Sequence, residues 1–564
     1  MNFIQRYKLK SSNKKSKMSL YSEVPWGVRF LQKLTDKCCP RLHFNREKCY
    51  RTSVVILTYI SYMCYHLSRK PISVVKAVLH RNCSDLQPPH PNEPNDWCDW
   101  APFGGTDSSA SQMLGELDSS FLFCYAIAMF FSGFIAERVN LRYFLSLGML
   151  LSGIFSYLFG IAKTYDIHNM SYYVAVQALA GIFQTTGWPG VVTIMSNWFG
   201  KSKRGLIFGL WNSHTSIGNI LGSLIAAEYV ETDWALSFIM PGLYIGLAGF
   251  VIFLFLVVNP SDVGCTAPNK IPDTRPKRVR QLESQVANDD DSSGIDSEVD
   301  DTDILIGEQA ILNRSRHLAN EVLEVQRRVT ERTNLLPRSS RAREERAIGF
   351  LSALRIPGVV EFSLALFFSK LVSYTFLYWL PLYVNHANGM SATLSADLST
   401  LFDVGGIAGA IIAGYVSDKS EMPATTCSVM LILAAPMMWV YQQVSPAGPV
   451  GLGINMLLLV IVGLLVNGPY ALITTAVSAE LGTHRSLEGN SKALATVTAI
   501  IDGTGSIGAA VGPLMAGFVT TYGWQNVFVM LMISDILALF LLVRLVKLEF
   551  VKLRNARRAG IRIE

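Results

Sequence analysis

The chain has 564 residues, of which 50% are apolar and only 16% are charged, and its net charge is +6. Soluble domains average about 25% charged residues, so this composition excludes an ordinary soluble protein. The apolar residues come in long blocks between short polar stretches, which predicts a polytopic helical membrane protein. The basic residues flank these blocks, so we expect no nucleic-acid partner and expect lipid around the spans.

The N-terminal tail, residues 1–51, carries thirteen Lys or Arg against three Asp or Glu. This excess beside the first apolar block predicts a cytosolic N-terminus. The tail contains no apolar core followed by a small-residue cleavage site. We therefore expect no cleavable signal peptide, and expect the first span to direct membrane insertion.

The first predicted span is a helix over about 52–79, and it contains Arg69 and Lys70. A cation inside an apolar span is costly and is a candidate functional residue, unless its side chain extends to the membrane surface. The apolar run continues to Val78, which favours a functional role for Arg69. No acidic residue lies near Arg69 in the sequence, so we expect its partner to be an anionic substrate.

The loop of residues 80–114 is predicted to be luminal or extracellular, because Arg81 is its only Lys or Arg. It contains the glycosylation sequon Asn82-Cys83-Ser84, which supports this topology more weakly than the charge contrast does. Cys83 and Cys98 share the loop and are candidates for a disulfide in an oxidising lumen, with two free thiols as the alternative. The nine cysteines include no CxxC pair, so we predict no metal or redox motif.

Five more apolar blocks complete an N-terminal six-helix bundle over 52–258: about 115–136, 142–162, 172–197, 206–228 and 236–258. The basic turns at 138–142 and 201–204 fall on the cytosolic side of this topology. A second sequon, Asn169-Met170-Ser171, falls in a luminal loop. The alternation of loops is therefore consistent with six spans.

Residues 259–354 interrupt the apolar pattern with an acidic tract at 289–303 and a basic stretch ending at 341–346. Such a composition cannot bury a core, so we predict a disordered cytosolic linker. A regulatory partner at this loop is one hypothesis for its role, and a simple tether is the favoured one.

A second six-helix bundle is predicted over 355–547, from blocks at about 355–385, 394–416, 424–442, 451–479, 493–518 and 526–547. The tail of residues 548–564 is basic, which predicts a cytosolic C-terminus. The sum is twelve transmembrane helices with both termini in the cytosol.

The two halves share short motifs. Gly133, Glu137 and Arg138 after the second span correspond to Gly414, Asp418 and Lys419 after the eighth. Ile217-Gly218 corresponds to Ile507-Gly508, at an offset of 290 residues. A parallel six-plus-six repeat around a long central loop is typical of the major facilitator superfamily, so this all-α membrane fold is expected.

A longer stretch narrows the resemblance. It comprises Gly187-Trp188-Pro189, then Asn197-Trp198-Phe199, then Lys203-Arg204-Gly205, then Trp211-Asn212-Ser213-His214. These residues resemble the organophosphate:phosphate antiporters of the superfamily. The length, the Pro-rich loop and the acidic central loop are most similar to the eukaryotic sugar-phosphate exchangers of solute carrier family 37, especially exchangers 1 and 2.

The resemblance implies roles for individual residues. Arg69 matches the phosphate-binding arginine of span 1, His214 matches the site histidine of span 5, and Tyr62 matches a cavity tyrosine. Trp188 and Pro189 are expected to shape their helix. Met129 stands where several relatives carry a lysine, which is a departure from the family pattern.

The second cation of the site is less well defined. Relatives place it at the position of Ser373, whereas Lys370 lies three residues earlier on the same helix face, and we predict that Lys370 takes the role. Asp502 stands 290 residues after Asn212, so both are predicted to face the cavity. Asp502 either binds sugar hydroxyls or pairs internally with Lys370 or another cation, and internal pairing is also expected of Asp403, a further intramembrane acid.

The resemblance implies antiport of a sugar phosphate, glucose 6-phosphate above all, against inorganic phosphate in the endoplasmic reticulum membrane. Arg69 and Lys370 would repel each other in the empty cavity until a phosphate neutralises them. We expect no enzyme activity, cofactor or metal. The alternatives are transport of glycerol 3-phosphate or another organic anion, and a non-transporting sensor or partner protein.

Overall fold

The computed structural model describes residues 24–38, 45–80, 100–104, 108–136, 138–199, 211–265, 350–444, 448–481 and 492–558. These residues form helices and short connections, with no strand among them, and the all-α prediction is confirmed. Several predictions fall outside these ranges: the sequon at Asn82, the Cys83 and Cys98 pair, Glu137, the basic turn 201–204 and most of the linker. They stay predictions.

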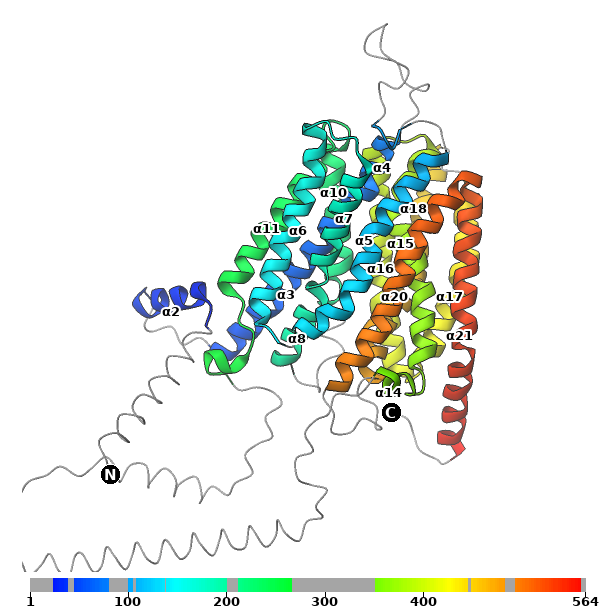
Figure 1. Cartoon of the computed structure of the whole chain (residues 1–564). Coiled ribbons are helices and arrows are strands. Elements are labelled where there is room, and N and C mark those ends of the chain that lie inside the picture. The colour runs from blue at the N-terminus through cyan, green and yellow to red at the C-terminus, as the bar shows by residue number, and fades with distance from the viewer. Residues whose placement is uncertain are drawn as a thin grey trace, which may run out of the picture. The chain divides into compact units, whose positions relative to one another are not determined.

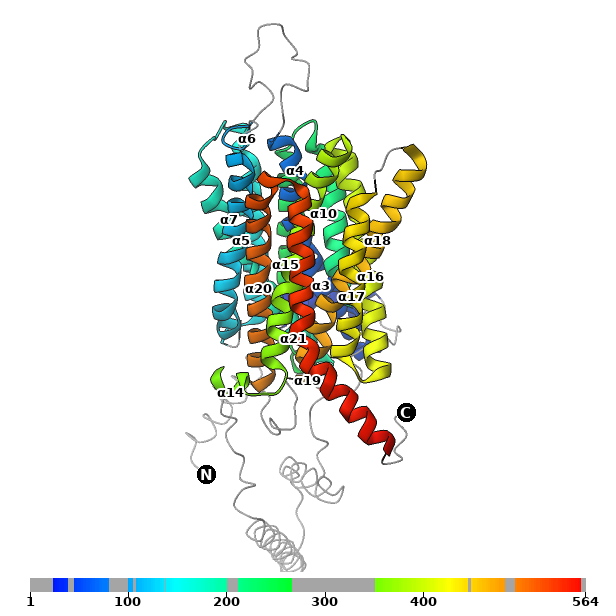
Figure 2. The same ribbon diagram turned by 90° about the vertical axis from the view of Figure 1, so that its right-hand side faces the viewer.

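Two sets of helices form the body of the protein (Figures 1 and 2). The N-terminal half contains α3 (Arg46–Arg69), α4 (Pro71–Leu79), α5 (Ser108–Ala136), α6 (Leu141–Thr164), α7 (Met170–Gln184), α8 (Gly187–Trp198), α10 (His214–Val230) and α11 (Leu236–Phe255). The C-terminal half contains α14 (Phe350–Leu354), α15 (Val359–Asn388), α16 (Ala392–Ser420), α17 (Pro423–Gln443), α18 (Gly448–Leu472), α19 (Ser478–Leu481), α20 (Lys492–Val519) and α21 (Trp524–Arg558). A π-helical turn, Ile473–Val477, joins α18 to α19.

Nine helices in the described ranges are long and apolar enough to cross a membrane: α5, α6, α11, α15, α16, α17, α18, α20 and α21. The other three predicted spans, the first, fourth and fifth, contain interruptions. The break in the first lies at Lys70, that in the fourth at Thr185 and Thr186, and that in the fifth at Asn212 and Ser213. Interrupted helices in transporters typically mark the binding site.

The prediction of one continuous helix over 52–79 is wrong, because α3 ends at Arg69 and α4 begins at Pro71. Proline has no backbone N–H and is tolerated in the first turn of a helix but not in its interior. Pro71 therefore starts a new helix. In the fourth span, the hydroxyls of Thr185 and Thr186 donate back to Ile182 O and Phe183 O, which satisfies carbonyls at the end of α7.

Two helical segments lie outside the predicted spans. Helix α2 (Trp26–Cys38) lies within the predicted tail, with Trp26, Phe30 and Leu34 exposed along one face. Its amphipathic pattern is typical of a helix at a membrane surface. The prediction from the sequence did not include this helix, because it rested only on the net charge of the tail. Helix α21 continues to Arg558, past the predicted end at 547. The Glu549 carboxylate accepts hydrogen bonds of 2.8 Å from two backbone N–H groups in the first turn of α17, which holds this extension.

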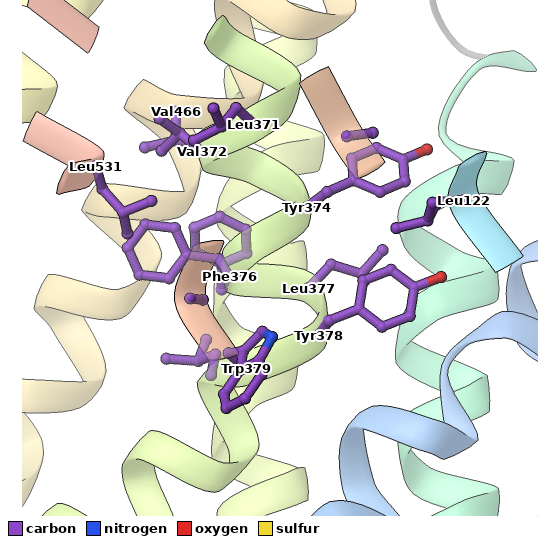
Figure 3. Packing of buried hydrophobic residues seen from close by; sticks show 14 of the residues in the cluster. Leu122, Leu371, Val372, Tyr374, Phe376, Leu377, Tyr378, Trp379, Val466 and Leu531 are labelled. Carbon is purple, nitrogen blue, oxygen red and sulfur yellow. The ribbon is translucent and has the colours of Figure 1, made fainter. Parts of the chain in front are cut away.

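Hydrogen bonds join the two halves at the end of the bundle that is predicted to be luminal. They end on main-chain carbonyls: Lys70 donates to Leu377, Lys76 to Tyr378, and Thr393 to Ala227. Figure 3 shows how the side chains of α15 point to its two sides. Tyr374 and Tyr378 point toward Leu122 of the N-terminal half, whereas Phe376 points to the opposite side, near Leu531.

Candidate functional site

Arg69 is the last residue of α3, directly before the break in the first span, and its side chain is buried. Its Nε donates to Gln184 Oε1 at 2.5 Å, and Gln184 Nε2 donates to Ser68 Oγ at 3.0 Å. The guanidinium carbon lies 4.7 Å from the centre of the Tyr125 ring. Its Nη2 is buried without a hydrogen-bond partner, and Arg69 forms no ion pair with any residue that the structure describes. A buried guanidinium in this condition is suited to bind an anion.

Three rings from different helices meet: Tyr62 of α3, Trp188 of α8 and His214 of α10. The centre of the Tyr62 ring lies 4.8 Å from that of His214 and 5.2 Å from that of Trp188. His214 Nε2 and Trp188 Nε1 are buried without hydrogen-bond partners. The structure thus brings together three residues that the family resemblance had singled out.

The Gly187-Trp188-Pro189 motif has a local explanation. Gly187 begins α8, and a Cβ atom at this position would lie 2.9 Å from the Tyr65 ring. Pro189 sits in the first turn of α8, where its missing N–H costs nothing. The motif therefore allows α8 to start against α3, and the helix-shaping role of Trp188 and Pro189 stays a prediction.

Lys370 and Asp502 form a buried ion pair, with 2.7 Å between Nζ and Oδ1. Of the two predicted alternatives for Asp502, the structure shows pairing with Lys370. The expectation of a bare Lys370 repelling Arg69 is therefore wrong in this conformation, because Asp502 neutralises the ammonium. Ser373 is also buried, and its Oγ has no hydrogen-bond partner.

Three charged residues were missing from the predicted site. Lys70 is buried and donates to Leu377 O at 2.9 Å. Lys76 and Asp118 form an ion pair with both side chains fully buried, and Lys76 also donates to Tyr378 O. The criterion that identified Arg69, a charge inside an apolar block, applies equally to these residues and would have found them.

A cavity of about 50 Å³, lined by polar and apolar side chains, lies between the halves. The N-terminal half contributes His66, Asn212 and Asn219, and the C-terminal half contributes Ser373, Asp403 and Asn467. Asn212 therefore faces the cavity, as predicted. Asp502 is not among the residues that line it.

The repeated motifs lie away from this cavity. Gly133 and Gly414 are in the last two turns of α5 and α16, and Arg138, Asp418 and Lys419 are exposed. Their conformational role stays a prediction. Met129 is buried on α5. The position that is a lysine in several relatives therefore carries an uncharged, buried side chain here. Asn169 is the exposed N-cap of α7, where its Oδ1 accepts from Ser171 N at 2.8 Å.

Comparison with known proteins shows the family to which the chain belongs. Residues 58–488 match the Major Facilitator Superfamily. The chain is 50% identical to glucose-6-phosphate exchanger SLC37A2 of Mus musculus over 517 residues, which cover 91% of this chain and 95% of the mouse protein. This chain belongs to the Major Facilitator Superfamily and, within it, to the SLC37 exchangers. It is also 52% identical to SLC37A2 of Danio rerio, covering 90% and 94% of the two chains. Its identity to SLC37A1 of Homo sapiens is 46%, covering 94% and 97%.

Solved structures show the same superfamily fold at low identity. A bacterial homologue of the human lysosomal transporter Spinster, in an inward-facing conformation, aligns with a TM-score of 0.52 and 14% identity, covering 89% of this chain and 96% of that one. A D-xylose-proton symporter aligns with a TM-score of 0.53 and 11% identity, covering 88% and 97%. The SLC37 member described here is therefore a multi-pass membrane protein with the transporter fold.

Proposed function

We propose that this SLC37 member exchanges a sugar phosphate, glucose 6-phosphate in particular, for inorganic phosphate by alternating access. The observation that carries the proposal is Arg69: a buried guanidinium with a free Nη2 and no carboxylate partner among the described residues. The mouse and zebrafish relatives are named glucose-6-phosphate exchangers, which supports this choice of substrate.

The charges of the site suit a dianion. A phosphate group carries close to two negative charges at neutral pH, since its second pKa is about 6. Arg69 supplies a planar fork that can hold two phosphate oxygens. Lys370 supplies a second cation if phosphate displaces Asp502 from it, and the 2.7 Å pair keeps the ammonium neutralised until then. One pair of cations then serves both substrates, because both carry the same group.

Alternating access needs contacts that break and reform. The bonds from Lys70 to Leu377 and from Lys76 to Tyr378 close the predicted luminal end in this conformation. Opening that end would break them, and substrate in the site would compensate for the exposed charge. Obligate exchange follows if the empty carrier reorients slowly. The proposal requires no covalent chemistry, cofactor or metal.

The proposed location is the endoplasmic reticulum membrane, with both termini and the 259–354 linker in the cytosol. One hypothesis for the linker is that it binds a regulatory partner. If the protein is a sensor rather than a transporter, the linker would carry the function. Deleting residues 262–345 separates the two hypotheses, because transport should survive the deletion and a function of the linker should not.

The direct test is counterflow in proteoliposomes. The purified protein is reconstituted into vesicles loaded with phosphate, and uptake of labelled glucose 6-phosphate, glycerol 3-phosphate and other organic anions is compared. We expect uptake of glucose 6-phosphate that requires internal phosphate. Equal or faster uptake of glycerol 3-phosphate would shift the proposed substrate, and no uptake of any organophosphate would contradict the proposal.

A further inference from the structure

The cavity between the halves contains a carboxylate that no cation neutralises by direct contact. Asp403 on α16 is 4% exposed, lines the cavity, and forms no ion pair with any residue in the described ranges. Its Oδ1 accepts a hydrogen bond of 2.9 Å from Asn219 Nδ2 on α10. Asn219 Oδ1 in turn lies 3.1 Å from His66 Nδ1 on α3. One oxygen of Asp403 is therefore held by a chain of side chains from the opposite half.

The other oxygen has no such partner. Asp403 Oδ2 is buried without a hydrogen bond, as is the Oγ of Ser373, which lines the same cavity. A buried acceptor left without a donor costs free energy, and for a charged group the cost is greater. An unsatisfied oxygen on a residue that lines a cavity therefore points to a ligand that donates a hydrogen bond there.

The chemistry of the cavity selects the kind of donor. A carboxylate repels phosphate oxygens but accepts strong hydrogen bonds from hydroxyl groups. Asn212 and Asn467, on opposite sides of the cavity, add amide donors and acceptors suited to further hydroxyls. Asp502 is unsuited to this role, because its carboxylate is held by Lys370.

The cavity also has a suitable position relative to Arg69. Tyr374 and Leu377 of α15 line the cavity between the halves, whereas Tyr378 lines a smaller space together with Arg69 and Gln184. Consecutive turns of one helix thus border both spaces. A ligand with a phosphate at one end and hydroxyls at the other could reach both along α15.

We propose that the cavity around Asp403 is the sugar subsite, and that Asp403 is a specificity-determining residue that accepts hydrogen bonds from sugar hydroxyls. This inference rests on the proposed exchange of sugar phosphate for phosphate. It assigns opposite charges to the two ends of the site, with Arg69 for the phosphate and Asp403 for the sugar. The resulting polarity orients the substrate.

Binding at this subsite is coupled to movement of the halves. A cavity of about 50 Å³ has room for only a few water molecules, so a hexose has to widen it. The bond from Asn219 to Asp403 joins the halves across the cavity. A sugar hydroxyl that replaces Asn219 as the donor compensates for the loss of this bond as α10 and α16 separate.

The test compares two exchange reactions of the reconstituted full chain. Phosphate:phosphate exchange needs only the phosphate site, whereas glucose 6-phosphate:phosphate exchange needs both. In Asp403→Asn we expect glucose 6-phosphate:phosphate exchange to fall much more than phosphate:phosphate exchange. We expect the KM for glucose 6-phosphate to rise about tenfold or more, because one charged acceptor is lost. The KM for glycerol 3-phosphate, which has fewer hydroxyls, should rise less.

Asp535→Asn is the matched control. Asp535 on α21 is equally buried, but it does not line the cavity, so its substitution should leave the ratio of the two exchange rates unchanged. Asp403→Glu is a second variant that keeps the charge and moves the carboxylate by one methylene, and it should also impair sugar phosphate selectively. Its phosphate:phosphate exchange reports correct folding even where Asp403→Asn fails to fold.

Two results would overturn the inference. Equal loss of both exchanges in Asp403→Glu and Asp403→Asn would make the carboxylate a conformational element, and normal glucose 6-phosphate kinetics in Asp403→Asn would remove it from the subsite. Absence of both exchanges in the wild type is a different outcome, since it overturns the proposed function on which the inference rests.

Discussion

Lys370 on α15 and Asp502 on α20 neutralise each other, with 2.7 Å between Nζ and Oδ1 and both side chains buried. Phosphate that reaches Lys370 has to compete with this carboxylate. Asp502→Asn removes the competitor and leaves an unpaired ammonium, so it should lower stability without ligand and raise the affinity for phosphate. We expect phosphate to stabilise this variant more than wild type in a thermal unfolding titration, with an apparent Kd lower by about threefold or more.

The companion variants separate Lys370 from Ser373. Lys370→Ala should abolish exchange, Lys370→Arg should retain some, and Ser373→Ala should be mild. The double variant Lys370→Ala/Asp502→Ala should recover folding but not exchange, because the uncompensated carboxylate is gone and the cation is still missing. Near-normal exchange by Lys370→Ala together with an inactive Ser373→Ala would assign the second phosphate contact to Ser373 instead.

Arg69 should be the least replaceable residue of the site. Removing its charge leaves a dianion half-neutralised in a cavity of low dielectric, which should cost at least about 2–5 kcal/mol of binding. That cost corresponds to a roughly 30-fold or greater loss of affinity. Arg69→Ala should abolish exchange in proteoliposomes, and Arg69→Lys should retain little, because lysine lacks the planar fork. Near-normal exchange by a correctly folded Arg69→Ala would refute the phosphate site.

The fully buried pair of Lys76 and Asp118 makes a separate prediction about stability. Asp118→Asn leaves Lys76 charged and unpaired inside the protein, and should destabilise the fold by about 3–5 kcal/mol. The double variant Lys76→Met/Asp118→Leu should recover much of this loss, since it removes both charges. Thermal unfolding of the single and double variants in detergent checks the prediction, and additive losses would show that the two side chains do not act as a pair.

His168, in the connection between α6 and α7, gives a pH-dependent prediction outside the spans. Its Nδ1 donates to Ala101 O at 2.8 Å, and its Nε2 lies 2.9 Å from Asp166 Oδ1. The bond to the Ala101 carbonyl and, secondly, the Asp166 carboxylate raise the pKa of His168 above 6.5. Because the folded protein favours the protonated ring, this contribution to stability is present at pH 5.5 and is lost as the pH rises through the raised pKa.

The variant His168→Gln reports this contribution. The difference in melting temperature between wild type and variant should be largest near pH 5.5 and should shrink by pH 8. A difference that is constant across this range would mean that the ring contributes by packing against Trp100 rather than by its charge.

Glycosylation tests the topology. We expect Asn82 and the exposed Asn169 to carry glycans on the luminal side. Glycosidase treatment should shift the wild-type band on a gel. The shift should persist in Asn82→Gln and in Asn169→Gln, and should vanish in the double variant. If the wild type shows no shift, the luminal placement of both loops depends on charge bias alone.

The local features of this protein could be predicted from its sequence. Long apolar blocks delimited the membrane helices because a bilayer requires about 20 apolar residues per span. Arg69 was conspicuous because a charge inside such a block is costly. The motif from Gly187 to His214 pointed to the family, and the match to SLC37 exchangers confirmed it. Pro71 was also a visible signal for the break in the first span.

The polar contacts of the site depend on how helices that lie far apart in the sequence pack together. Gln184 reaches Arg69 across 115 residues, Asp502 reaches Lys370 across 132, and Asp403 accepts from Asn219 across 184. Helical periodicity relates residues within a few turns and carries no information about partners on another helix. The sequence singled out Asp502 as the acid that faces the cavity, because it stands 290 residues after Asn212, and it gave no such sign for Asp403. Packing reverses this assignment, because Lys370 lies beside Asp502 and the cavity between the halves lies beside Asp403.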